Sequence, residues 1–232
     1  MAGAYIALQG ERIPMNKNKY THVFWDWNGT IIDDLEINFS VINTLLSIRK
    51  KDIISLFQYR QAFTFPIKEF YGRVGLPIND EQYEKLVSDY WALYKSKAKD
   101  IPLMIGVLDV LNMLRKNQIK QYVLSASDKK MVFDQMSIYG IRELFEDVIA
   151  PQDGYAFGKI ELAKQWMSKQ NISPSDILMI GDTLHDFETA NAIGIDCALV
   201  DMGHQDLNPY INNSKFMVYE NINKLVDIVF AF

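Results

Sequence analysis

The chain has 232 residues, of which 49% are hydrophobic and 23% charged, with a formal net charge of −5. This is the composition of a globular protein, and it argues against nucleic acid as the main partner because no excess of Lys and Arg is available to neutralise phosphates. The length suits one large domain or a core with an inserted subdomain. No apolar run has the length of a signal peptide or a membrane span. The single cysteine, Cys197, excludes an internal disulfide and favours a cytoplasmic location.

Short apolar runs alternate with longer amphipathic stretches along most of the chain. Strands are predicted at residues 22–25, 121–124, 147–150, 177–180, 197–200 and 216–218. Helices are predicted at residues 107–116, 129–139, 160–170, 186–193 and 221–229. Because the strands are apolar without alternation and are separated by helices, we expect an α/β fold with a doubly wound, Rossmann-like parallel sheet.

The first two predicted strands are separated by roughly ninety residues, far more than a crossover needs. This stretch is dense in helical patterns and aromatic residues, and most of its rings are expected to form the core of a helical cap, with a few lining a ligand cleft. We therefore predict an extension at 1–19, an α/β core at 20–33 and 103–232, and a cap at 34–102. Met15 precedes a polar stretch and is an alternative candidate for the natural start.

The octapeptide V-F-W-D-W-N-G-T at residues 23–30 carries the first chemical signal. Its apolar run ends at Asp26, which places a carboxylate at the carboxyl edge of the predicted sheet, where open α/β folds bind ligands. Asn28 stands two residues later, followed by Gly29 and Thr30. A site with a nucleophilic or metal-binding carboxylate usually needs a second acid at this position to transfer a proton, and the amide of Asn28 cannot do so.

Three further segments follow predicted strand ends or begin predicted helices. Ser125 lies in S-A-S, Lys159 in F-G-K-I, and Asp182 and Asp186 in G-D-T-L-H-D. Each is weak alone, since serine after a strand is often a turn or capping residue. Their order and their placement on strand ends together predict one shared active site.

These residue types suit phosphoryl transfer. Asp26 can attack phosphorus and hold an aspartyl-phosphate, while Lys159 and the Ser125 hydroxyl offset the charge of the phosphoryl oxygens. Asp26 and Asp182 supply oxygen ligands for Mg²⁺, and Asp186 lies one helical turn further on as a supporting acceptor. Thr30 and backbone N–H groups near Ser125, including that of Ala126, complete the predicted phosphate-binding set.

With these four motifs the sequence resembles the haloacid dehalogenase superfamily, most closely its phosphoglycolate phosphatase-like branch, from about residue 20 onward. The resemblance implies a helical cap after the first motif and hydrolysis of a small phosphorylated metabolite. It implies that Asp26 is the nucleophile and that Ser125 and Lys159 bind phosphate. It also implies that Mg²⁺ is held by Asp26, the main-chain carbonyl of Asn28 and Asp182.

Asn28 departs from the family pattern, in which a second Asp protonates the leaving group. Such a group typically contributes about 10²–10⁴-fold to the rate. The substrate could have a leaving group that needs no proton, such as an acyl phosphate. The enzyme could instead be slow, or retain only phosphate binding in a regulatory role. Deamidation of Asn28-Gly29 to Asp is a fourth possibility.

Two other branches of the family fit less well. A dehalogenase is disfavoured by Asp182 and Asp186, because dehalogenase chemistry needs no metal. A phosphonate hydrolase would need a lysine in the cap, and nothing in the sequence singles out Lys68 for that role.

His185, between the two motif acids, is a further candidate to face the cleft. Arg60 and Arg73 in the cap are candidates to meet a substrate anion, although exposed helix arginines are common. His204 is assigned no catalytic role.

Overall fold

The computed structural model describes residues 19–98, 101–152 and 158–230. The predicted N-terminal extension and Met15 therefore lie, apart from Lys19, outside the described residues. In this described part of the chain, no helix is both long enough and apolar enough to cross a bilayer.

Six parallel strands form one sheet in the order β3-β2-β1-β4-β5-β6. Their bounds are β1 His22–Trp25, β2 Lys120–Leu124, β3 Asp147–Ile149, β4 Ile177–Gly181, β5 Asp196–Val200 and β6 Met217–Tyr219. Each predicted strand is confirmed to within one residue at either end. Strands β2 and β3 lie on one side of β1, and strands β4, β5 and β6 lie on the other, so the direction in which strands are added reverses between β1 and β4. Such a switch point is where doubly wound sheets bind ligands.

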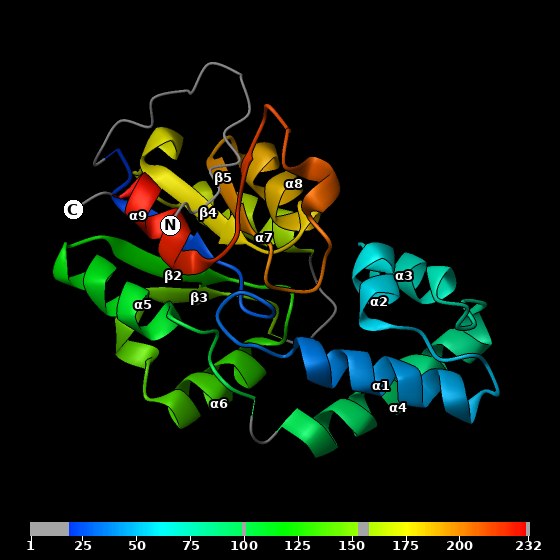
Figure 1. Ribbon diagram of the computed structural model, residues 1–232. Helices are drawn as coiled ribbons and strands as arrows, with labels where there is room; N and C mark the ends of the chain where they lie inside the picture. The colour runs from blue at the N-terminus through cyan, green and yellow to red at the C-terminus, as the bar shows by residue number, and fades with distance from the viewer. Residues whose placement is uncertain (1–18, 99–100, 153–157, 231–232) are drawn as a thin grey trace.

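Five helices cover the two faces of the sheet (Figure 1). Their bounds are α5 Val107–Lys116, α6 Lys129–Tyr139, α7 Lys159–Met167, α8 Leu184–Ile193 and α9 Ile222–Val229. Alternate residues of each strand point to opposite faces. Trp25 and Val123 therefore pack with α5, α6 and α9, whereas Phe24 and Tyr122 pack with α7 and α8. This arrangement confirms the predicted doubly wound α/β core.

Four helices between β1 and α5 form the inserted cap. Their bounds are α1 Leu35–Ile48, α2 Leu56–Ala62, α3 Ile67–Arg73 and α4 Asp80–Lys97. They lie together to one side of the sheet, and α1 packs along α4 (Figure 1). The cap has its own buried cluster, to which Tyr59, Phe63 and Phe70 contribute, as predicted for the aromatic residues of this stretch. Phe57 is an exception, because 63% of it is exposed.

Candidate active site

The loop after β1 brings Asp26 to the carboxyl edge of the sheet. Its backbone N–H donates to the Ile180 carbonyl at the end of β4, 2.9 Å away, and 14% of its side chain is exposed. The loop then turns at Gly29, whose φ of +71° favours glycine. A Cβ at this position would overlap the Asp182 carboxylate and the ring of His204. The turn thus lets the backbone approach the second acid closely.

Lys159, the first residue of α7, joins two of the predicted site acids. Its Nζ donates to Asp26 Oδ1 at 2.7 Å and to Asp186 Oδ1 at 2.5 Å, and its side chain is only 2% exposed. The other oxygen of Asp186 accepts from the backbone N–H of Asp182 and from the N–H and hydroxyl of Thr183. Asp186 is therefore fully engaged by protein donors, in keeping with a supporting rather than a reacting group.

Asp26, Asp182 and Asp186 form a compact acid cluster, each offering a carboxylate oxygen within 4.8 Å of the others. Asp182 Oδ1 accepts from the hydroxyl of Thr30 at 3.1 Å, and its Oδ2 accepts from the N–H of His204 at 2.6 Å. Burial, reinforced by the charge of Asp186, raises the pKa of Asp26 to about 8 against the attraction of Lys159. Burial likewise raises the pKa of Asp182 to about 6, although His204 opposes this.

These residues fit the Mg²⁺ that the family pattern implies. Hard carboxylate oxygens are the donors that Mg²⁺ takes. Three acids lie close together here, and Lys159 pairs with two of them, Asp26 and Asp186. Burial is the main reason that the pKa values of Asp26 and Asp182 are raised, and the negative charge of Asp186 adds to both shifts. A divalent cation would offset this negative charge.

The end of β2 contributes Ser125, whose buried side chain lies next to the β1 loop. Its N–H donates to Ile149 at 3.0 Å, and its hydroxyl oxygen accepts from the N–H of Ser127 at 3.0 Å. Ala126, between the two serines, is exposed. The hydroxyl of Ser127 donates to Asn28 Oδ1 at 2.6 Å, which ties the two loops together.

The Asn28 side chain is held at both ends. Its Nδ2 donates to Asp34 Oδ2 at 2.7 Å, while its Oδ1 accepts from Ser127. Since an ionised carboxylate can only accept, these partners fix the orientation of the amide.

Asp34 and His204 form a buried ion pair that sequence reasoning missed. His204 Nε2 lies 3.0 Å from Asp34 Oδ1, and the two side chains are 5% and 1% exposed. Asp34 also accepts from the Gly29 N–H at 3.0 Å and from Asn38 Nδ2 at 2.7 Å. Burial alone would lower the pKa of His204, but the Asp34 carboxylate raises it to about 9. The sequence signal for Asp34 is its position four residues after Thr30, the end of the first motif. His204 lies in a loop that its sequence does not distinguish.

Helix α2 docks the cap on the loop that follows β5. Arg60 reaches Asp201 at 2.5 Å and the carbonyls of Gly203 and Gln205 at 3.0 and 2.9 Å. Tyr59 contributes its hydroxyl, 3.0 Å from His204 Nδ1. Arg60 therefore binds the core rather than standing free to meet a substrate anion.

The second cap arginine considered from the sequence points elsewhere. Arg73 pairs with Glu69 at 2.7 Å, and both side chains are about half exposed, at 46% and 52%. His185, in contrast, does lie at the cap, because Phe65 stacks on its ring with centroids 4.4 Å apart. Burial lowers the pKa of His185, and the charge of Lys159 acts in the same direction.

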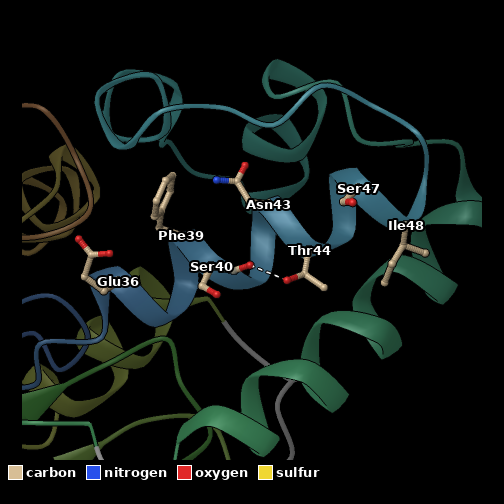
Figure 2. A pocket seen from close by; sticks show the side chains of 7 residues that line it. All are labelled: Glu36, Phe39, Ser40, Asn43, Thr44, Ser47 and Ile48. Atoms are coloured by element: carbon tan, nitrogen blue, oxygen red, sulfur yellow. Dashed lines mark hydrogen bonds between the residues drawn. The ribbon is translucent and has the colours of Figure 1, made fainter.

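A separate hollow of about 470 Å³ runs along α1 (Figure 2). It is lined by residues of that helix alone, namely Glu36, Phe39, Ser40, Asn43, Thr44, Ser47 and Ile48. Its polar groups are largely engaged, since Asn43 pairs with the backbone of Ile54 and Ser40 accepts from Lys97. The acids and lysine of the site do not line this hollow.

Comparison with known proteins shows the family to which the chain belongs. Residues 23–200 match the family model of haloacid dehalogenase-like hydrolases. The chain belongs to this family.

Its relatives narrow the class further. A phosphoglycolate phosphatase of Synechococcus elongatus is 23% identical over 184 residues, covering 79% of this chain and 85% of the relative. Phosphoglycolate phosphatase 1 of Pseudomonas aeruginosa is 20% identical over 214 residues, covering 88% and 78%. The chain is thus similar to the phosphoglycolate phosphatase-like branch.

Solved structures share the fold. A haloacid dehalogenase-like family hydrolase from Streptococcus pneumoniae has a TM-score of 0.68 at 19% identity, covering 90% of this chain and 98% of its own. Protein Tyrosine Kinase A of Mycobacterium tuberculosis has a TM-score of 0.74 at 21% identity, covering 91% and 98%. Proteins with such different names share this fold, so the activity must be argued from the site.

Proposed function

We propose that this protein is a cytoplasmic, Mg²⁺-dependent phosphomonoesterase that hydrolyses a small phosphorylated metabolite through an aspartyl-phosphate at Asp26. The observation that carries the proposal is the position of Lys159, which binds Asp26 and Asp186 beside the third acid, Asp182. A cation held between a nucleophile and its supporting acid suits binding of a phosphoryl group.

In this proposal, Asp26 attacks phosphorus, the bond from phosphorus to the leaving oxygen breaks, and water then hydrolyses the acyl phosphate. Lys159, Ser125 and the Ala126 N–H group bind the phosphoryl oxygens. Thr30 would contribute through its backbone N–H, because its hydroxyl donates to Asp182. Asp26, the Asn28 carbonyl and Asp182 would hold Mg²⁺, which supplies charge neutralisation at the phosphoryl oxygens.

Asn28 limits this mechanism, because its amide cannot protonate the departing oxygen. The Asp34 carboxylate beside it is paired with His204, whose charge lowers the pKa of Asp34 despite burial. Asp34 is therefore an ionised acceptor and not a proton donor. A catalytically impaired or regulatory phosphate-binding protein is the second candidate, and the Asn28 amide is the observation that favours it.

The test measures phosphate release with MgCl₂ from alkyl, aryl and acyl phosphates. For Asp26→Asn we expect a loss of at least about 10³-fold, because the variant lacks the nucleophile. Asp134→Asn is the matched control, since that aspartate is exposed on α6, where it pairs with Lys130. Turnover in Asp26→Asn equal to wild type would refute the covalent mechanism. If phosphate and Mg²⁺ raised the melting temperature while no ester was hydrolysed, the binding-protein candidate would be favoured.

A further inference from the structure

Two cap phenylalanines rest on two core histidines that flank the acid cluster. Phe63 stacks on His204 with ring centroids 4.9 Å apart, and Phe65 stacks on His185 at 4.4 Å. The backbone N–H of His204 donates to Asp182, and His185 directly precedes the Asp186 that binds Lys159. The cap therefore meets both sides of the acid cluster with aromatic rings.

The two stacks differ in exposure. Phe63 and His204 are buried, with only 7% and 4% of their surface exposed. Phe65 is half-buried, and 18% of the His185 side chain is exposed. Of the two stacks, the Phe65–His185 stack is thus the one that a molecule from solvent can reach.

The cations that the structure describes at this junction are already paired. Arg60 binds Asp201, Lys159 binds Asp26 and Asp186, and His204 binds Asp34. A carboxylate on the leaving group would have to lose water against aromatic rings without a free cation to receive it. Such burial is strongly unfavourable.

Asn28 adds an independent requirement. Without a proton donor at this position, the leaving oxygen must depart as an anion. A phenol, with a pKa of about 10 like that of tyrosine, is a far better anion than an alcohol. An aryl group also offers a flat apolar face that matches the Phe65–His185 stack.

We propose that this site hydrolyses phosphate esters of aromatic hydroxyls and discriminates against esters whose leaving group carries a carboxylate. The inference rests on the proposed phosphatase function and names its substrate class. In the reaction, the bond between phosphorus and the aryl oxygen breaks as the bond to Asp26 forms, and the phenolate takes its proton from water.

The first test compares kcat/KM for phenyl phosphate and 2-phosphoglycolate with MgCl₂ present. We expect phenyl phosphate to be preferred by at least about tenfold, because a desolvated carboxylate without a partner is costly. A series of substituted phenyl phosphates should show rates that rise steeply as the phenol becomes more acidic. Equal or higher kcat/KM for 2-phosphoglycolate would overturn the inference.

The second test concerns the ring surface itself. Phe65→Ala should lower kcat/KM for phenyl phosphate by about three- to tenfold, the usual worth of an aromatic pair, with no matching loss for acetyl phosphate. Phe65→Leu, which keeps the apolar bulk, should lose less, and circular dichroism is used to check that both variants fold. Phe57→Ala is the matched control, because Phe57 lies exposed on α2. Equal losses on both substrates in Phe65→Ala would contradict a role in recognising the aryl group.

Binding separates this inference from the proposed function. Calorimetry with Mg²⁺ should show tighter binding of phenylphosphonate than of phosphonoacetate, whether or not any ester is hydrolysed. If no ester is hydrolysed and phenylphosphonate still binds more tightly, the phosphatase proposal fails and the ligand class stands. Tighter binding of phosphonoacetate would overturn the ligand class even in an active enzyme.

Discussion

The side-chain amide of Asn28 donates a hydrogen bond to the carboxylate of Asp34 across 2.7 Å. The acid that the family pattern expects at position 28 is absent, and an acid six residues later lies against that position instead. Because Asp34 also pairs with His204, the amide and the ion pair form one connected buried network. Asn28 therefore fits its surroundings as an amide, and a carboxylate in its place would meet another carboxylate.

We expect Asn28→Asp alone to destabilise the protein by about 1–3 kcal/mol at neutral pH, because a bond is lost and two buried carboxylates face each other. Urea unfolding measures the free energy, and the penalty should shrink on acidification as the pair takes up a proton. The double variant Asn28→Asp/Asp34→Asn restores an acid–amide pair with the roles exchanged. It should recover only part of the stability, because Asp34→Asn also removes the charge that pairs with His204. It should gain about 10²–10⁴-fold in hydrolysis of alkyl phosphates. Wild-type stability in the single variant would contradict this account.

The sequence was sufficient to predict the sheet and the order of the motifs, because the apolar runs and strand-end polar residues are local signals. It could not predict the partners of Asn28. Asp34 forms a hydrogen bond with Asn28 across a turn, and His204, which pairs with Asp34, lies in a loop 170 residues after it in the chain. Such contacts depend on how the cap docks on the core. For the same reason, the sequence could only name Arg60 as a candidate to meet a substrate anion, whereas the structure shows that it binds the core.

Removing the buried charge of Lys159 should destabilise the protein strongly. For Lys159→Met without metal we expect a loss of about 3–5 kcal/mol at neutral pH, because the buried Asp186 carboxylate would lose its cation. Adding Mg²⁺ should recover part of this loss by supplying positive charge. Lys130→Met is the control, since its bond to Asp134 is exposed and such pairs contribute about 0–1 kcal/mol. Similar unfolding free energies for the two variants would rule out the compensating role of Lys159.

Arg60 should determine how firmly the cap is held on the core. Arg60→Met removes one ion pair and three bonds to loop carbonyls, so we expect faster cleavage by trypsin at cap–core connections and a higher KM. The stability loss should be about 1–3 kcal/mol, because partly buried partners lose their donor. Arg73→Met is matched in chemistry and lies in the same cap, but its partner Glu69 is exposed, so it should change little. Equal proteolysis of the two variants would show that Arg60 does not hold the cap.

Stability and Mg²⁺ binding should depend on pH in opposite directions. The pKa values of Asp26 and Asp182 are raised to about 8 and about 6, so the folded protein retains protons that the unfolded chain has lost. Without metal, stability should therefore fall as pH rises from about 4 to about 8. The pKa of His204 is raised to about 9. The stability that its ion pair with Asp34 contributes is therefore complete below about pH 6.5 and is lost as the pH rises to about 9, which is the same direction of change.

Mg²⁺ binds the deprotonated carboxylates, so its affinity should rise with pH by up to about a hundredfold per unit below about pH 6, where both acids must lose a proton. It should rise by up to about tenfold per unit from there to about pH 8 and then level off. Calorimetry in two buffers of different ionisation enthalpy measures both the affinity and the protons released. Asp182→Asn should weaken binding and reduce the proton release, whereas Asp134→Asn should change neither. An affinity that is flat between pH 5 and 8 would mean that these acids do not exchange protons for the metal.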